Sequence, residues 1–192
     1  TTIESLELEI QSNSSSAISG IDALAQSIEA FWNKNATTES KQYAIKAIHL
    51  LWKQLPLLIQ SPSPQLRNEV AEGAYWAGRA INITKTTAPH AYSYAFTSDY
   101  GYPHGHAVAL TLPFFIALNG NNELYKLLQI DSQNCVQDMI AYLKQLNLDC
   151  NLTHVNIDNI LQKVNTQRLS NNPILITNEI VQQLRDYLTS TK

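Results

Sequence analysis

Apolar residues recur at a helical spacing along most of this chain. The first run, with three or four positions between neighbours, consists of Ile21, Leu24, Ile28 and Phe31. A second run with the same period extends from Tyr43 to Leu55. Side chains at this period share one face of a helix, so the pattern predicts amphipathic helices that pack on a common core.

Capping residues and prolines divide this pattern into separate helices. Ser19 and Thr38 are candidate N-caps of the first two helices, and Pro56 is expected to close the second. Pro64 then opens a third helix, expected at 65–81.

The rest of the chain continues in the same way. Prolines divide its middle at Pro89, Pro103 and Pro113. An apolar stretch at 107–118 ends in a polar turn at 119–122. Further helices are expected at 133–146, 156–165 and 178–189. The sequence contains neither a strand–helix alternation nor a glycine-rich phosphate loop. It therefore predicts an all-α, multi-helix fold.

The N-terminal residues 1–16 differ in composition from the rest of the chain. They are rich in Ser and Thr, and apolar residues alternate from Leu6 to Ile10, which predicts a short extended piece. We expect this segment to be a connector and 17–192 to form one domain, because a chain of 192 residues suits a single core. The chain starts at Thr1 rather than at methionine, as expected of a processed or excised piece.

Composition and charge restrict the classes of partner. Hydrophobic residues make up 44% of the chain and charged residues 15%, which is typical of a globular protein. The net charge of −3 and the lack of a basic run offer no attraction to nucleic acid. No apolar run approaches the ~20 residues that cross a bilayer. Cys135 and Cys150 form no CxxC pair, so we expect a cytoplasmic protein with both thiols free and buried.

Two polar residues on the first expected helix are candidates to hold a small ligand. Asp22 and Gln26 lie four positions apart, so their side chains project from one face. Because such pairs are common on helices, a solvated or helix-capping pair is the alternative.

Histidines and tyrosines gather between Pro89 and His106. Three of the five histidines lie here, His90, His104 and His106, together with four tyrosines. Imidazole is a common ligand of divalent transition metals, and two histidines with a carboxylate are typical of a Lewis-acid centre. A hydrogen-bonded core cluster is the alternative.

The order and separation of these motifs resemble the paired signatures of iron-containing, group III alcohol dehydrogenases. The resemblance rests on the segments 19–31, 90–113 and 168–173, with Asn119 after the apolar helix. It covers nearly the whole chain. It implies the helical C-terminal domain of the dehydroquinate synthase-like fold, to which residues 1–16 would connect an N-terminal nucleotide-binding domain that this chain lacks.

The resemblance also implies a set of metal ligands. The family holds its metal with one aspartate and three histidines, and Asp22, His90 and His104 match three of these positions. Gln26 stands where the family carries the remaining histidine. An amide oxygen is a weaker ligand, so we expect weaker binding of Fe²⁺, with Zn²⁺ or an empty site as alternatives.

A second departure from the family concerns proton delivery. Tyr94 stands where many members carry another histidine, and a phenol does not titrate near neutrality. We expect Tyr94 or His106, with water, to deliver the proton. His106 lies two residues from His104 and so on another helix face, which makes a structural role its alternative.

A cation among hydroxyls precedes His90. Lys85 lies between Thr84 and Thr86, and this combination suits an anionic substrate group. An exposed loop is the alternative. Arg168 is a second candidate for substrate binding, against ordinary pairing at a helix end. The segments around Lys85 and His104 most resemble the branch of the family that reduces phosphonoacetaldehyde to 2-hydroxyethylphosphonate.

Together these expectations describe an aldehyde reductase whose metal polarises the carbonyl while NAD(P)H, held by the other domain, delivers hydride. Alone, this chain is expected to be inactive. An uncharged alcohol or aldehyde substrate, or a non-catalytic helical module with a decayed metal site, are the alternatives. The tryptophans Trp32, Trp52 and Trp76 are expected in the core or at a subunit interface, which leaves a homodimer open.

Overall fold

The computed structural model describes the backbone of residues 3–190 and the side chains of residues 14–190, and this part of the chain is helical outside its turns and loops. The helices are α1 (Ile3–Trp32), α2 (Thr38–Gln60), α3 (Pro64–Thr84), α4 (Ala88–Tyr100), α5 (His104–Asn119), α6 (Asn122–Leu128), α7 (Cys135–Gln145), α8 (Ile157–Gln162), α9 (Thr166–Leu169) and α10 (Asn178–Ser190). The predicted all-α fold is confirmed.

The first helix is longer than the sequence indicated. It begins at Ile3, so the extended piece expected from Leu6 to Ile10 was wrong, and Ser19 lies inside the helix instead of capping it. Helix formation is cooperative, and adding a residue to an existing helix is far easier than starting one. Three alternating apolar positions are too weak a signal to stop a helix that continues into the core.

Two prolines lie within helices: Pro56, which was expected to close the second helix, in α2, and Pro113, which was expected to divide the middle of the chain, in α5. A proline inside a helix costs about 3 kcal/mol. In α5 the neighbouring Leu112 and Phe115 are completely buried, so packing outweighs this cost. Pro64 behaves as expected, because it occupies the first turn of α3, where its missing N–H is not needed.

The remaining helix ends lie close to the predicted ones. Thr37 rather than Thr38 caps α2, through a capping box with Ser40. The tail helices α7 and α8 are shorter than predicted, while α10 ends one residue later than expected. The short helices α6 and α9 were not predicted, since they have too few turns to show a period.

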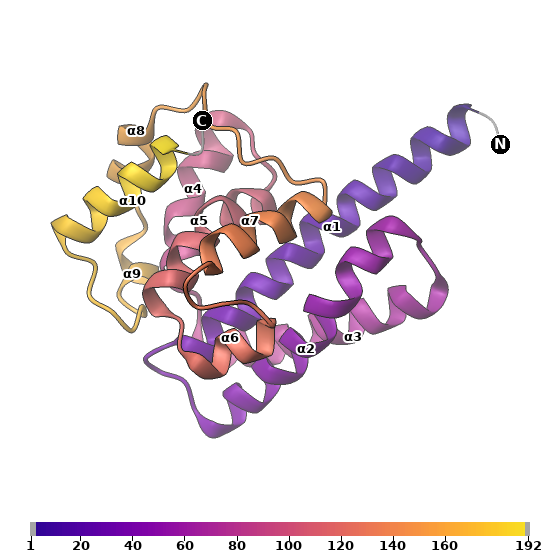
Figure 1. Ribbon diagram of the computed structural model, residues 1–192, viewed down its shortest axis with the longest axis horizontal. Coiled ribbons are helices and arrows are strands. Elements are labelled where there is room, and N and C mark those ends of the chain that lie inside the picture. The colour runs from indigo at the N-terminus through magenta and orange to yellow at the C-terminus, as the bar shows by residue number, and fades with distance from the viewer. Residues whose placement is uncertain (1–2, 191–192) are drawn as a thin grey trace.

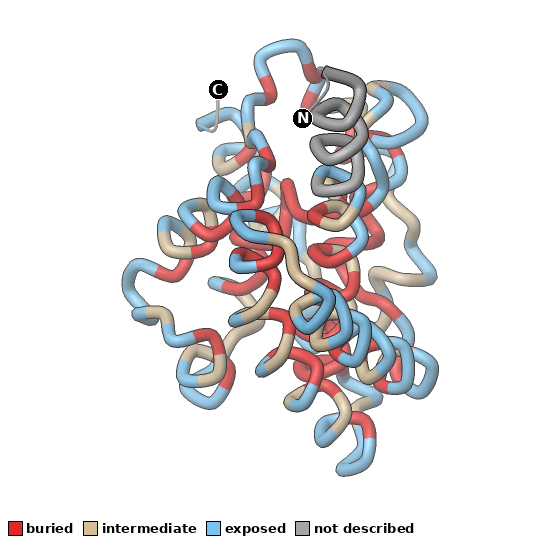
Figure 2. Tube along the Cα trace, turned by 90° about the vertical axis from the view of Figure 1, so that its right-hand side faces the viewer, coloured by how far each residue is buried: buried red, intermediate tan, exposed pale blue. Residues whose placement is uncertain are grey.

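Helix α1 runs between two groups of helices (Figure 1). The hairpin of α2 and α3 packs on one side of it, and α5 packs on another, with α4 and α7 against α5. Helices α8, α9 and α10 cover the outer side of α4 and α5. Buried positions lie on the inward-facing turns (Figure 2).

The core contains the apolar stripes that the sequence predicted. Leu24, Ile28, Ile48 and Leu51 are all 0% exposed, so the faces of α1 and α2 form one continuous interior. Both cysteines are free; Cys135 is buried and Cys150 is half-buried.

The three tryptophans lie at or beside the core, Trp32 buried and Trp52 and Trp76 partly so. In the described part of the chain, no helix is both long enough and apolar enough to cross a membrane.

One glycine allows the approach that matters most for the site. A Cβ added at Gly105 would lie 2.0 Å from the backbone oxygen of Ile18 and 3.1 Å from the Cβ of Asp22. Only a residue without a side chain permits this contact between α5 and α1. The first residue of α5, His104, is thereby brought beside Asp22.

Candidate metal centre

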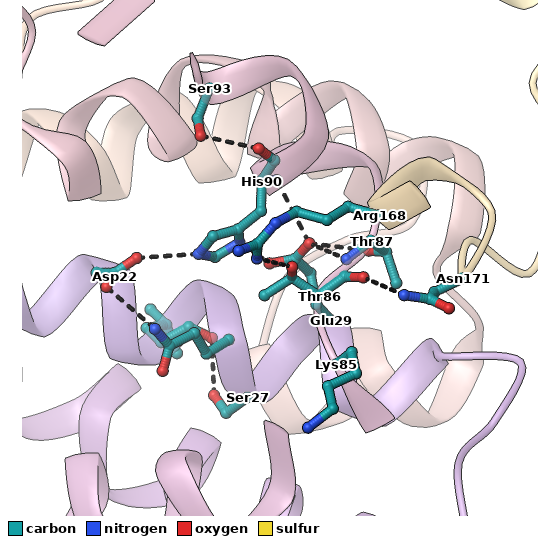
Figure 3. Close-up of polar contacts among 12 residues, drawn as sticks. Asp22, Ser27, Glu29, Lys85, Thr86, Thr87, His90, Ser93, Arg168 and Asn171 are labelled. Atoms are coloured by element: carbon teal, nitrogen blue, oxygen red, sulfur yellow. Dashed lines mark hydrogen bonds and ion pairs between the residues drawn. The ribbon is translucent and has the colours of Figure 1, made fainter. Parts of the chain in front are cut away.

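Three side chains from three helices converge at one point. Asp22 lies within α1, His90 in the first turn of α4, and His104 begins α5. Each offers one ligand atom, and these atoms all lie within 4.8 Å of one another. The Nε2 atoms of His90 and His104 are 3.1 and 3.8 Å from Oδ1 of Asp22 (Figure 3 shows the first pair). Atoms bound to one ion at about 2.1 Å lie about 3 to 4 Å apart, so this donor set fits a divalent metal ion.

The three residues differ in exposure. His90 is 2% exposed and Asp22 is half-buried, whereas the side chain of His104 is 47% exposed. The cluster is therefore closed on the core side and open on the other. Catalytic metal sites keep such an open position for substrate or water, while structural sites are closed.

Gln26 adjoins the cluster. Its Nε2 donates to Oδ2 of Asp22 at 3.1 Å. The two ends of a side-chain amide exchange by a simple rotation. An oxygen can thus be presented to the same point, and Gln26 lies beside the three converging ligands.

Sequence reasoning missed one residue of this site, Glu29. It is completely buried and hydrogen-bonds Nδ1 of His90 through Oε2 (Figure 3). Its other oxygen accepts from the backbone N and the Oγ1 of Thr87, at 2.8 and 2.9 Å. The available signal was its position seven residues after Asp22, which places both carboxylates on one face of α1.

The environment shifts the pKa values of the two histidines in opposite directions. Burial by itself lowers the pKa of His90, but the charge of Glu29 and hydrogen bonds with Asp22 and Glu29 raise it to about 9. Burial lowers the pKa of His104, opposed by Asp22 and reinforced by His90 and Arg168. At neutral pH the metal-free cluster therefore carries its proton on His90, and metal binding must release it.

A cleft of about 550 Å³ opens beside the cluster. It is lined by Gln26, Gly78, Ile81, Asn82, Lys85, Thr86, His90, His104, Gln167, Arg168 and Asn171. Both expected substrate-binding residues, Lys85 and Arg168, thus line the same cavity as three of the four expected metal ligands, Gln26, His90 and His104.

Lys85 has an unusual backbone. Its φ of 66° and ψ of 173° lie in a region that residues other than glycine rarely adopt. Its carbonyl oxygen accepts from Nδ2 of Asn33 at 2.9 Å, and its Nζ donates to the carbonyl oxygen of Asn82 at 2.9 Å. The chain therefore turns sharply at Lys85, between the end of α3 and the start of α4.

Arg168 is held from two sides. Its Nη1 donates to Oγ1 of Thr86, and its guanidinium lies 5.4 Å from the ring centroid of Tyr94. Nδ2 of Asn171 donates to the carbonyl oxygen of Thr86 at 3.0 Å, which ties the segment after α9 to the same part of the cleft wall (Figure 3). The long side chain of Arg168 is positioned before any ligand enters.

The two residues expected to deliver a proton lie apart from each other. Tyr94 is 37% exposed and contacts Arg168, which lines the cleft. The structure does not bring His106 to the cluster, because its Nε2 donates to the backbone oxygen of Asp149 and its ring packs edge-on against Tyr102.

Comparison with known families agrees with this geometry. The family model described as "Fe-containing alcohol dehydrogenase family, C-terminal" matches residues 16–186. The chain belongs to this family. The match confirms, at the level of the family, the resemblance seen in the sequence motifs. Iron, which the family description names, is also the metal expected at the cluster of Asp22, His90 and His104.

Three relatives show the range within the family. The phosphonoacetaldehyde reductase of Streptomyces viridochromogenes is 34% identical over 100 residues, covering 52% of this chain and 25% of that protein. Long-chain-alcohol dehydrogenase 1 of Geobacillus thermodenitrificans is 28% identical over 149 residues, covering 69% of this chain and 38% of that protein.

The structure of sulfoacetaldehyde reductase from Bifidobacterium kashiwanohense in complex with NAD⁺ superimposes with a TM-score of 0.84 at 27% identity, covering 94% of this chain and 51% of that one. This chain therefore spans about half the length of that relative and less of the two others.

Proposed function

We propose that this chain forms the metal- and substrate-binding half of an NAD(P)-dependent aldehyde reductase whose substrate carries an anionic group, with phosphonoacetaldehyde as the first candidate. The observation that carries the proposal is that Lys85 and Arg168 line the cleft into which His90 and His104 open. A small molecule in that cleft can touch the metal cluster at one end and two cations at the other.

The two cations are free to bind an anion. Within the part of the chain that the structure describes, neither Lys85 nor Arg168 pairs with a carboxylate. Each donates to a neutral oxygen instead, of Asn82 and Thr86 respectively. Charge-assisted bonds to a phosphonate are stronger than these neutral ones, and a guanidinium can make two at once.

Each part of the site has a separate task in this proposal. When bound, a divalent ion held by Asp22, His90 and His104 would supply a Lewis acid for the aldehyde oxygen, and NAD(P)H would supply the hydride. Lys85 and Arg168 bind the phosphonate, which orients the carbonyl carbon and removes the need for a tighter apolar pocket. Gln26 would complete the ligand set through its amide oxygen, after rotation of the amide.

For proton delivery we favour Tyr94 over His106. The ring of Tyr94 lies against Arg168, a residue of the cleft wall. His106 donates to the backbone oxygen of Asp149 instead and does not line the cleft.

The proposal requires a nucleotide-binding half. We propose that residues 1–16 lead to it, since the family match begins at residue 16 and the matching relatives are longer. Without that half, the hydride donor is not positioned, and the 192-residue chain is expected to show no oxidation of NAD(P)H.

Two of the relatives are named for anionic substrates. The names phosphonoacetaldehyde reductase and sulfoacetaldehyde reductase both describe aldehydes that carry an acidic group. Long-chain-alcohol dehydrogenase 1 stands for the alternative, a neutral substrate turned over by the same chemistry.

Calorimetry on the Zn²⁺-loaded chain tests this proposal. We expect the wild type to bind 2-hydroxyethylphosphonate at least tenfold more tightly than 1-propanol. Lys85→Ala and Arg168→Ala should each remove most of this preference. Lys163→Ala is the matched control, because this exposed lysine pairs with Asp99 outside the cleft and should leave binding unchanged.

The outcomes separate the candidate functions. Equal binding of both ligands, unaffected by Lys85→Ala, would indicate a neutral substrate. Failure of the wild type to bind Zn²⁺ or Fe²⁺ under anaerobic loading would instead favour a non-catalytic helical module.

A further inference from the structure

Among the described residues, Glu29 is the only acidic side chain that is completely buried, and it lies beside the cluster. The proposed reaction does not use it. Every group that contacts it is a hydrogen-bond donor. Its Oε1 accepts from the N and Oγ1 of Thr87 and, at 3.5 Å, from the N of His90, while Oε2 accepts from Nδ1 of His90. A carboxylate, which only accepts, matches this set.

The first contact of Glu29 explains how α4 begins. Thr87 is the N-cap residue of α4, yet its own side chain caps nothing. Its Oγ1 accepts from Nε1 of Trp32 at 3.0 Å, so its hydroxyl hydrogen is directed to Glu29. Glu29 thus takes over the cap by binding the free N–H groups of Thr87 and His90, and its negative charge lies at the positive end of the helix.

The second contact fixes the ring of His90. Because Nδ1 donates to Glu29, the proton of a neutral His90 resides on Nδ1, and the lone pair of Nε2 faces Asp22 and the cleft. A histidine that ligates through Nε2 requires this tautomer. The same carboxylate therefore sets where α4 starts and which nitrogen of His90 is presented.

We infer that Glu29 is the positioning residue of the metal centre, one that acts through His90 and couples the start of α4 to the ligand geometry. The inference rests on the metal site of the proposed function, and it is independent of the substrate. Trp32 and Thr87 extend the same chain of contacts. Helix α1 therefore supplies the ligand Asp22 and also the side chains that orient the ligand His90.

The test compares Zn²⁺ affinity, measured by competition with a chromophoric chelator, in the wild type and in Glu29→Gln. A glutamine has one accepting and one donating end, so either His90 or Thr87 must face an N–H group. We expect the affinity to fall about 10- to 100-fold, as for other residues that support metal ligands. The matched control is Glu39→Gln, the same carboxylate-to-amide change on an exposed residue of α2, which should leave the Zn²⁺ affinity unchanged.

Thr87→Ala separates ligand positioning from helix capping. It removes one donor to Glu29 and leaves the contact with His90 in place, so Zn²⁺ affinity should change less than threefold while stability decreases. An equal loss of affinity in Thr87→Ala and Glu29→Gln would show that Glu29 acts only by capping α4, and would overturn the inference.

A measurement on the wild type covers the case in which Glu29→Gln does not fold. Long-range ¹⁵N–¹H spectra of the Zn²⁺-loaded chain should show the proton of His90 on Nδ1 and a metal-shifted Nε2. A proton on Nε2 would overturn the inference while the metal site stands. A wild type that binds no Zn²⁺ would remove the site itself, and unchanged affinity in a folded Glu29→Gln would refute the role of Glu29 alone.

Discussion

Asn33 donates its side-chain amide to the carbonyl oxygen of Lys85 at 2.9 Å, and in doing so it holds the only residue of the cleft wall that has a positive φ. The first residue after α1 thereby stabilises a turn that Lys85 would not adopt by itself. Strained backbone of this kind costs about 1 to 3 kcal/mol and persists only where its surroundings enforce it. Here it separates two helices and directs the segment from Lys85 to Thr87 along the cleft.

Replacing Lys85 by glycine should relieve this strain. We expect Lys85→Gly to be about 1 kcal/mol more stable than Lys85→Ala, because glycine adopts the observed φ of 66° without steric cost. Urea unfolding measures the difference. Gly101→Ala is the complementary control, since Gly101 has a φ of 72° with open space around it and should be destabilised by a similar amount. A Lys85→Gly variant less stable than Lys85→Ala would contradict the strain.

Gly105 should be intolerant of a side chain. A Cβ there would lie 2.0 Å from the backbone oxygen of Ile18, so Gly105→Ala must push α5 away from α1. We expect a loss of at least about 2 kcal/mol in the free energy of unfolding, in the range of overpacked cores, together with weaker metal binding.

The control for this prediction is Gly78→Ala in α3. A Cβ at Gly78 meets nothing within 4 Å, and alanine favours a helix by about 1 kcal/mol over glycine. Thermal unfolding should therefore shift in opposite directions for the two variants. Equal shifts would mean that the α1–α5 contact is not as close as the structure shows.

Introducing a histidine at position 26 should strengthen the metal centre. Gln26 lies four residues from Asp22 and beside the cluster, and imidazole is a better ligand than an amide for Fe²⁺ and Zn²⁺. We expect Gln26→His to raise the affinity at least tenfold in chelator competition. Gln182→His on α10 is matched to it, because Gln182 also bonds an aspartate four residues away and lies far from the site in sequence. The same gain in both variants would indicate nonspecific binding.

The metal-free chain should lose stability as the pH rises from neutral. The folded-state pKa of His90 is raised from 6.5 to about 9. The stabilisation that protonated His90 gives the folded state is therefore complete below pH 6.5 and is lost as the pH rises through 9. At about 1.4 kcal/mol per pKa unit, the change amounts to a few kcal/mol. Denaturant unfolding with chelator at pH 6.5, 8 and 9.5 measures it.

The charged and titratable groups that contact His90 are Asp22, Glu29 and His104. The pKa of His104 is lowered, so His104 contributes stability above pH 6.5, and this contribution is lost only as the pH falls below 6.5. His90→Gln should therefore flatten the profile above pH 6.5 and leave most of the acidic part, because burial is the largest cause of the lowered pKa of His104. A wild-type profile without slope between pH 6.5 and 9 would contradict the raised pKa.

The sequence by itself determined the class of fold and most of the metal cluster. Leu24, Ile28 and Leu51 recur at a helical period that needs no tertiary information, since burial of one face sets that period. Asp22, His90 and His104 were predicted to be ligands by their match to family motifs, and the structure places the three side chains together.

Only the tertiary structure decided how these parts act together. The role of Glu29 depends on α4 beginning against α1, and the placement of His106 depends on the loop at Asp149. The strained turn at Lys85 depends on Asn33, which lies 52 residues away in the chain. Hydrogen bonds between distant segments produce no periodic pattern in a sequence, because they depend on which helices pack together and on where along their axes they meet.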